Sequence, residues 1–154
     1  MADHIAATFA VDGYDRRVEN GPVVLYVAEL IGETVHVRWV SENFERLLGH
    51  DSGACIANPD WWLNHIHPDD QAALLHRRTQ LPLIERMAFE YRFCHGDGGY
   101  RQISDNVNIV TGEPGAPTQV IGALFDITDR KDIEDAIRRA NDRLNFLLSD
   151  GPGV

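Results

Sequence analysis

Residues 87–110, MAFEYRFCHGDGGYRQISDNVNIV, decide the fold. Phe89, Tyr91 and Phe93 alternate with polar residues, so they fall on one face of an extended strand. The glycine-rich segment 96–99 then turns the chain back into a second strand that is rich in β-branched and polar residues. This pattern predicts a long antiparallel hairpin with one aromatic face.

Three more strands are predicted, one after this hairpin in the sequence and two before it. After a loop rich in glycine and proline, residues 118–127 read as a last strand beside the hairpin. Near the start, residues 23–31 and 34–40 read as two strands joined by the turn at Gly32. Alternation places Val37 and Trp39 on the same face of the second of these strands.

Short helices are predicted between the two groups of strands. Residues 41–43, Ser-Glu-Asn, can cap a helix that runs to Leu48 and ends at Gly49. Residues 67–70, His-Pro-Asp-Asp, begin a second helix that extends to about Gln80, because proline suits the first helical position and acidic residues suit the first turn. Two strands, several helices and three strands predict an α+β fold with helices on one side of an antiparallel sheet.

Composition and charge argue against several classes of partner. The chain has 154 residues and a formal net charge of -10, which would repel the phosphates of nucleic acids and anionic lipid surfaces. No apolar run approaches the roughly 20 residues needed to cross a bilayer, and the N-terminus lacks the basic start of a secretory signal. We therefore expect a cytoplasmic domain without nucleic-acid partners. Cys55 and Cys94 form no Cys-x-x-Cys pair and read as two buried thiols.

A series of short segments stands in a recognisable order along the chain: Val40-Ser41-Glu42-Asn43-Phe44, Leu47-Leu48-Gly49, Trp62-Leu63, His67-Pro68-Asp69-Asp70, Glu90-Tyr91-Arg92, Asp97-Gly98, Tyr100-Arg101, Gly122 and Asp126-Ile127-Thr128-Asp129-Arg130-Lys131. With these segments the sequence resembles the PAS/PAC sensory-box family over about residues 23–131. The resemblance implies a five-stranded antiparallel sheet in the order 2-1-5-4-3, short helices on one face, often a ligand cavity between them, and a C-terminal signalling helix. Gln102 departs from the family pattern, since many members carry tryptophan there.

The chain divides into four expected parts. Residues 1–22 are an N-terminal helix or arm, 23–128 the PAS/PAC sensory domain, and 129–148 an amphipathic or coiled-coil linker helix. Residues 149–154 are expected to be the start of a second PAS repeat, because Asp150-Gly151-Pro152-Gly153-Val154 echoes Asn20-Gly21-Pro22-Val23-Val24.

The linker helix carries apolar residues at alternating steps of four and three, which is the spacing of a dimer seam. An amphipathic helix that folds back on its own domain is the alternative. The seam residues are Ile133, Ile137, Ala140, Leu144 and Leu147.

The function expected from these features is sensory input and dimerisation, with Asp126, Ile127 and Thr128 as the junction that relays a signal into the C-terminal helix. By resemblance, the chain is the N-terminal part of a multidomain bacterial protein that ends in a histidine kinase or a cyclic-di-GMP synthase or hydrolase. A structural dimerisation spacer without ligand is the first alternative. A small pocket enzyme is the second and has less support.

The pocket is expected to be lined by inward strand residues, although such residues are more often plain core. The candidates are Tyr26, Trp39, Phe89, Tyr91 and Phe125. Two charged pairs, Glu90 with Arg92 and Asp105 with Arg101, are either acids and bases of a cavity or cross-strand ion pairs, and ion pairs are the commoner case on sheets.

No catalytic motif stands out, since the chain has no Gly-x-Ser-x-Gly and no phosphate-binding glycine loop. His65, His67, Asp69 and Asp70 lie close together and could suggest a metal site, but a helix start already accounts for three of them, so no metal is expected. A flavin photosensor would need a reactive cysteine in a context that Cys55 lacks. A haem sensor would depend on His76, with Arg77 or Arg78 at the propionates, and reads better as a surface histidine. The cofactor is left open.

Overall fold

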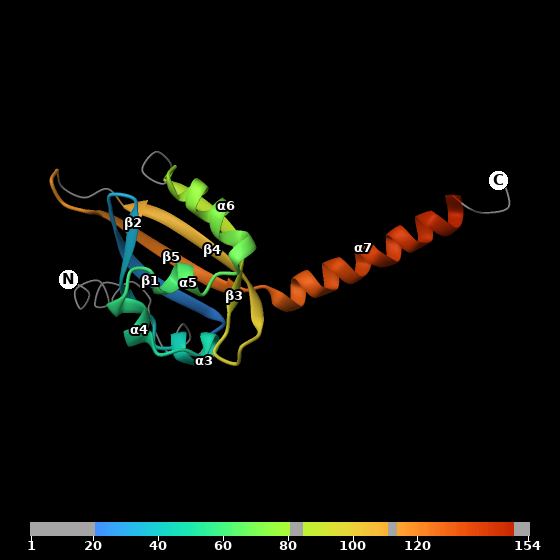
Figure 1. Cartoon of the computed structure of the whole chain (residues 1–154), viewed down its shortest axis with the longest axis horizontal. Helices are drawn as coiled ribbons and strands as arrows, with labels where there is room; N and C mark the ends of the chain where they lie inside the picture. Colours follow the sequence, from blue (N-terminus) through green and yellow to red (C-terminus); the bar gives the residue numbers. More distant parts are fainter. Residues whose placement is uncertain (1–20, 81–84, 111–113, 150–154) are drawn as a thin grey trace.

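The computed structural model describes residues 21–80, 85–110 and 114–149, with side chains described as far as Asn145. Five strands form one antiparallel sheet in the order β2-β1-β5-β4-β3, which confirms the expected topology (Figure 1). The strands are β1 (Val23–Ile31), β2 (Thr34–Val40), β3 (Arg86–Cys94), β4 (Tyr100–Val110) and β5 (Thr118–Asp126).

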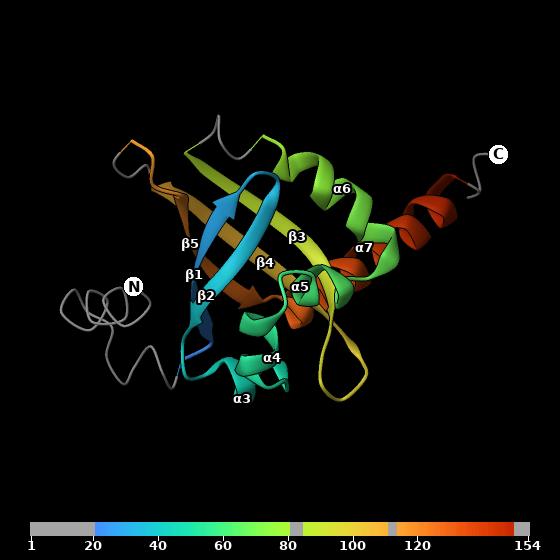
Figure 2. The same cartoon turned by 60° about the vertical axis from the view of Figure 1, so that its left-hand side comes forward.

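Within the described ranges, four short helices cover one face of the sheet, and a longer helix leaves it (Figure 2). The covering helices are α3 (Phe44–Leu48), α4 (Ser52–Ala57), α5 (Trp61–Asn64) and α6 (Pro68–Arg78). The long helix is α7 (Thr128–Ser149), which begins at the end of β5 and projects away from the sheet (Figure 1). No helix within the described ranges is both long and apolar enough to span a membrane.

The core lies between the sheet and the short helices. Phe44, Ile66 and Phe93 are each at most 1% exposed, and they come from α3, the link between α5 and α6, and β3. The ring of Phe93 stacks on Trp62 of α5 with centroids 4.4 Å apart. Aromatic contacts of this kind add about 0.5–1.5 kcal/mol beyond the area they bury, so they hold the short helices against the sheet.

Strand β2 contains an irregularity that changes which side chains face inward. Tyr26 of β1 pairs with Val40, Val27 with Trp39, and Ala28 with Val37, so Arg38 is skipped in the register. Because directly paired residues point to the same face, Trp39 shares the outer face with Val27, while Val37 and Val40 face the helices. The expectation that Trp39 lies on the same face as Val37 is therefore wrong, and the bulge is the reason.

The start of α6 is attached to the open edge of β3. Arg92 donates to Asp70 through its backbone N (2.8 Å), its Nε (3.0 Å) and its Nη2 (2.9 Å). The backbone of residues 65–67 also pairs with this edge, since Cys94 N donates to His65 O (2.7 Å) and His67 N donates to Arg92 O (2.8 Å). Arg92 thus pairs with Asp70 rather than Glu90, a correction to one of the cross-strand pairs.

The expected N-terminal arm and the expected start of a second repeat fall mostly on residues 1–20 and 150–154, outside the described residues. Within the described part, the linker helix starts at Thr128, one residue before its expected boundary.

Candidate ligand-binding cavity

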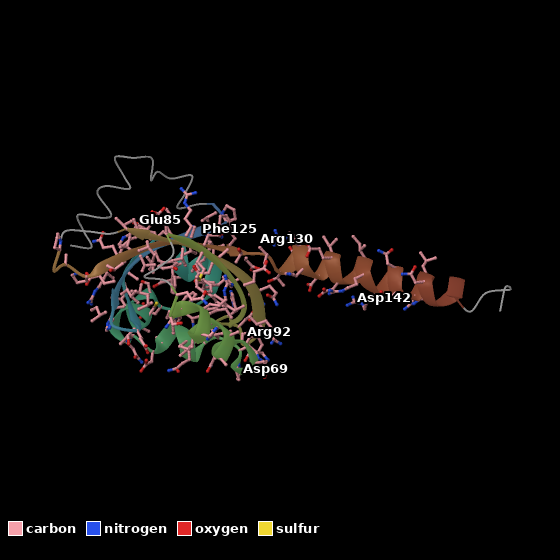
Figure 3. All side chains as sticks on the ribbon, turned by 90° about the horizontal axis from the view of Figure 1, so that it is seen from above. Asp69, Glu85, Arg92, Phe125, Arg130 and Asp142 are labelled. Carbon is pink, nitrogen blue, oxygen red and sulfur yellow. The ribbon has the colours of Figure 1, made fainter. Side chains whose placement is uncertain are left out.

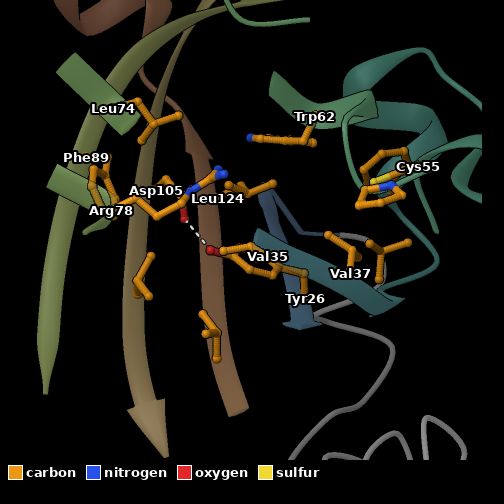
Figure 4. Close-up of a pocket in the computed structure, with 15 residues that line it drawn as sticks. Tyr26, Val35, Val37, Cys55, Trp62, Leu74, Arg78, Phe89, Asp105 and Leu124 are labelled. Carbon is orange, nitrogen blue, oxygen red and sulfur yellow. Dashed lines mark hydrogen bonds between the residues drawn. The ribbon is translucent and has the colours of Figure 1, made fainter. Parts of the chain in front are cut away.

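A cavity of about 50 Å³, partly open to solvent, lies between the sheet and helices α4 to α6 (Figure 4). Most of its wall is aliphatic or aromatic, with only a few polar groups. The residues that line it are Tyr26, Val35, Val37, Val40, Phe44, Cys55, Pro59, Trp62, Leu74, Arg78, Phe89, Asp105, Val107, Val120 and Leu124.

Asp105 of β4 forms the centre of a buried hydrogen-bond network at one side of this cavity. Its Oδ1 accepts from the Tyr26 hydroxyl (2.8 Å), and its Oδ2 accepts from the Tyr91 hydroxyl (2.9 Å). The Tyr91 hydroxyl in turn accepts from Nε1 of Trp62 (2.9 Å). Tyrosines from β1 and β3 thus donate to one carboxylate, and a tryptophan from α5 joins the network through Tyr91.

Burial shifts the acid–base properties of this network. Burial raises the pKa of Asp105 to about 6, although the hydrogen bonds from Tyr26 and Tyr91 oppose the shift. Burial, followed by the nearby Asp105 charge, raises the pKa of Tyr26 and Tyr91 well above the ordinary tyrosine value. Both hydroxyls therefore stay protonated at neutral pH and remain hydrogen-bond donors to Asp105.

Arg78, in the last turn of α6, supplies the cavity's cationic side chain. Figure 4 shows it extending into the cavity on the side of Asp105. Among the residues that the structure describes, none forms a hydrogen bond or ion pair with its guanidinium group. Burial lowers the pKa of Arg78, while the charges of Tyr91, Tyr26 and Asp105 act in the opposite direction. The neighbouring Arg77 is placed differently, with its guanidinium carbon 4.9 Å from the centre of the Phe89 ring.

Gly122 makes the position of Tyr26 possible. The two residues are paired across β1 and β5, and a Cβ at Gly122 would lie 2.1 Å from Cζ of the Tyr26 ring. The ring lies flat over the glycine because no side chain is present there. This close approach directs the Tyr26 hydroxyl along the sheet to Asp105 on the next strand.

The polar groups of the cavity suit binding better than catalysis. Both oxygens of Asp105 already accept from tyrosines, and burial raises the pKa of the Cys55 thiol to about 12, so this thiol is not a ready nucleophile. Across the described ranges, no three His, Cys, Asp or Glu side chains gather in a way that could hold a metal ion.

The structure places the five pocket candidates in different environments. Tyr26 and Phe89 line the cavity, whereas Tyr91 does not line it but donates to Asp105, which does. Trp39 and Phe125 do not line it. Phe125 is 38% exposed, and it points to the outer face because its neighbour Leu124 points inward.

Two polar residues of the cavity have roles that the sequence pattern did not assign. Asp105 was expected to pair with Arg101, but Arg101 instead donates to Asp97 (2.6 Å) in the hairpin turn. The sequence pattern connects Arg78 with His76 alone, through the propionates of a haem. Its place at the end of α6 follows from how the helix packs, a property that no local motif signals.

The root of α7 is fixed to the sheet by backbone and side-chain bonds. Ile127 N donates to Gln102 O (2.8 Å), and Gln102 N donates to Oγ1 of Thr128 (2.9 Å). Thr128 N donates to Oδ1 of Asp126 (2.9 Å), which caps the first turn of the helix. The departure from the family pattern at Gln102 leaves this junction intact, because Gln102 contributes backbone groups only.

Two ion pairs also hold the start of α7 against the sheet. Glu90 of β3 lies 3.3 Å from Nη2 of Arg130 through one carboxylate oxygen and 3.3 Å from Nζ of Lys131 through the other. Figure 3 shows Arg130 at the root of α7 and Asp142 on the part that projects from the domain. Glu90 therefore pairs with the start of α7 and not with Arg92.

Beyond its root, α7 exposes the expected seam. Ile133, Ile137 and Leu144 are 61%, 57% and 56% exposed, and Ala140 is exposed as well. The backbone of Leu147 lies in the helix, but its side chain is outside the described residues. The helix does not fold back to bury these residues on its own domain.

Two curated proteins are similar to this chain in sequence. The chain is 25% identical over 139 residues to the two-component sensor PprA of Pseudomonas aeruginosa, an alignment that covers 89% of this chain and 15% of that protein. An uncharacterized protein, y4lL, of Sinorhizobium fredii is 23% identical over 146 residues, which is 93% of this chain and 17% of that protein. The chain thus spans less than a fifth of the curated relatives that it matches.

Solved structures of sensory domains have a similar fold. The N-terminal domain of a diguanylate cyclase with PAS/PAC sensor from Marinobacter aquaeolei matches with 25% identity and a TM-score of 0.61, over 71% of this chain and 98% of that one. A sensory box histidine kinase/response regulator from Burkholderia thailandensis matches with 26% identity and a TM-score of 0.63, over 86% and 97%. The sequence profile of the PAS fold matches residues 37–124, more than half of the chain. Together with the sheet order and the cavity, these matches show that the chain belongs to the PAS fold family.

Proposed function

We propose that this chain is the sensory input and dimerisation domain of a longer signalling protein, and that it relays occupancy of its cavity through α7. The observation that carries the proposal is the root of α7, which is bonded to the strands that also wall the cavity. Gln102 on β4 binds Ile127 and Thr128, and three residues further along the same strand Asp105 faces the cavity.

Strand β3 offers the shortest route between cavity and helix. Tyr91 points inward and donates to Asp105, while the adjacent Glu90 points outward and pairs with Arg130 and Lys131. A ligand that shifts Tyr91 would therefore also shift the residue that positions α7. A route of this kind is a physical connection between two sites, and its role in signalling is tested only by breaking it.

The relatives support an output domain in the same parent chain, since one is a two-component sensor and two structural neighbours are a histidine kinase and a diguanylate cyclase. The parent is proposed to be a sensor histidine kinase or a cyclic-di-GMP synthase or hydrolase, acting in the cytoplasm. The exposed seam of α7 supports a homodimer in which the two copies of this helix pack together.

Changing Thr128 to valine is expected to alter the output of the full-length parent. The substitution keeps the size of the side chain but removes the oxygen that accepts from Gln102 N at 2.9 Å. Thr118→Val, at the opposite end of β5, is the matched control. The measurement is the catalytic activity of the output domain with and without each substitution. Unchanged output activity in Thr128→Val would contradict the proposed relay through α7.

Replacing Ile133 and Ile137 together by aspartate is expected to convert the chain from dimer to monomer. Each change puts a charge into an apolar seam, so the dissociation constant should rise by more than about 100-fold. Light scattering coupled to size-exclusion chromatography measures the mass directly. Arg139→Asp, on an exposed flank of the same helix, should remain a dimer. A wild-type chain that is already monomeric would contradict the proposed dimer.

A dimerisation spacer that binds nothing is the second candidate, and the small volume of the cavity favours it. The free volume of about 50 Å³ leaves room for only a few heavy atoms. Native mass spectrometry of the purified chain separates the two functions, because a sensor can retain a small molecule and a spacer retains none.

A further inference from the structure

Arg78 is a cation without a hydrogen-bond or ion-pair partner among the described residues, and it lies in a mostly apolar cavity. It is half-buried, lines the cavity, and makes no hydrogen bond or ion pair with any residue that the structure describes. Removing a guanidinium group from water without pairing it is unfavourable. An anion that entered the cavity would recover this loss.

The other polar groups of the cavity are already committed. Tyr26 and Tyr91 donate to Asp105, and Trp62 donates to Tyr91. Both carboxylate oxygens of Asp105 accept hydrogen bonds from the tyrosines, and Asp105 forms no ion pair with Arg78. Arg78 therefore supplies the free donors of this site, and a ligand must satisfy them.

We propose that the cavity binds a small monocarboxylate with a short apolar chain, whose carboxylate pairs with Arg78. The planar guanidinium matches a carboxylate through two parallel hydrogen bonds. The aliphatic wall formed by residues such as Val37, Val120 and Leu124 suits the hydrocarbon part. This inference rests on the proposed sensory function, since it names the class of molecule that would be sensed.

Size and charge both restrict the ligand. The cavity of about 50 Å³ is several times the roughly 10–15 Å³ that one water needs, so it takes only a few heavy atoms. The cavity holds one arginine, and the Asp105 carboxylate lies in the same wall, so a dianion such as phosphate or a dicarboxylate would add two negative charges where a monocarboxylate adds one. A monocarboxylate of about four carbons fits both limits.

Butyrate is the probe, and butyramide, with the same shape but no charge, is the matched control ligand. Ligands of this size bind weakly, so ligand-observed NMR on the full chain at millimolar ligand concentrations is the suitable measurement. Butyrate is expected to bind at least about 10-fold more tightly than butyramide, because hydrogen bonds to a charged group are the stronger ones.

Replacing Arg78 with leucine is expected to weaken butyrate binding by about 10- to 100-fold. Arg77→Leu, one residue earlier on the same helix, should leave binding within about twofold of wild type, because its guanidinium lies over Phe89 and does not line the cavity. Arg78→Gln removes the charge and keeps a polar side chain, so it gives the same result should leucine prevent folding.

Equal binding of butyrate and butyramide, absence of binding by both, or full binding by a folded Arg78 variant would each overturn the proposal. The proposed sensory function fails by a different result, namely unchanged output of the parent with Thr128→Val. The two tests are therefore independent: loss of the carboxylate site alone would leave a relay with another input.

Discussion

Replacing Gly122 with alanine is expected to lower the free energy of unfolding by about 3 kcal/mol. The new Cβ would lie 2.1 Å from Cζ and 2.4 Å from the hydroxyl oxygen of Tyr26, far inside van der Waals contact. The ring has little room to move, because it is buried and its hydroxyl is bonded to Asp105 at 2.8 Å. The protein must break this bond, bend the sheet, or both.

Urea denaturation followed by circular dichroism measures this loss, and a Tyr26→Leu background provides the control. Leucine lacks the ring atoms that clash, so Gly122→Ala should cost less than about 1 kcal/mol in that background. An equal cost in both backgrounds would show that the strand, and not the tyrosine ring, requires glycine.

The stability of the domain is expected to fall by about 2 kcal/mol between pH 4 and pH 7 because of Asp105 alone. Its pKa in the folded protein is raised from 3.8 to about 6. The folded state therefore holds the proton more tightly than the unfolded chain. This contribution is most favourable below about pH 4, is lost as the pH rises, and levels off above about pH 6.

Unfolding free energies measured at several pH values in wild type and Asp105→Asn test this expectation. Asparagine does not ionise, so the variant should lack this part of the fall, although its absolute stability also changes through altered hydrogen bonds with Tyr26 and Tyr91. Asp97→Asn is the control, since Gly99 N and Arg101 lower the pKa of Asp97 and its effect is confined to more acid pH. Identical pH profiles for wild type and Asp105→Asn would contradict the raised pKa.

Much of the fold could be predicted from the sequence because its signals are local. The alternation in residues 87–94 specifies a strand with one aromatic face. The left-handed backbone at Gly49 (φ 74°) ends α3, and the His67 side chain accepts from Asp69 N at the start of α6. Each of these features depends on residues only a few positions apart, so no knowledge of the packing is required.

The polar part of the site depends on long-range contacts, and sequence patterns did not reveal it. Tyr26 and Asp105 are 79 residues apart in the chain, and Arg92 and Asp70 are 22 apart. The skipped residue in β2 moves Trp39 to the outer face, and alternation alone cannot show such a bulge. Asp105 and Arg101 looked like an ordinary pair on one strand. Only the packed sheet reveals that Asp105 has two tyrosine donors and faces an arginine from α6.

The cover over the edge of β3 also limits how copies of this chain can associate. An edge strand with free backbone groups is a template onto which another chain can add a strand, and this leads to aggregation. Here the backbone groups of Arg92 and Cys94 that point away from β4 are already occupied by His65, His67 and Asp70. At this end of the sheet, a second copy cannot add a strand to β3 without first displacing the start of α6. The start of α6 therefore protects this edge of the domain against aggregation by strand addition.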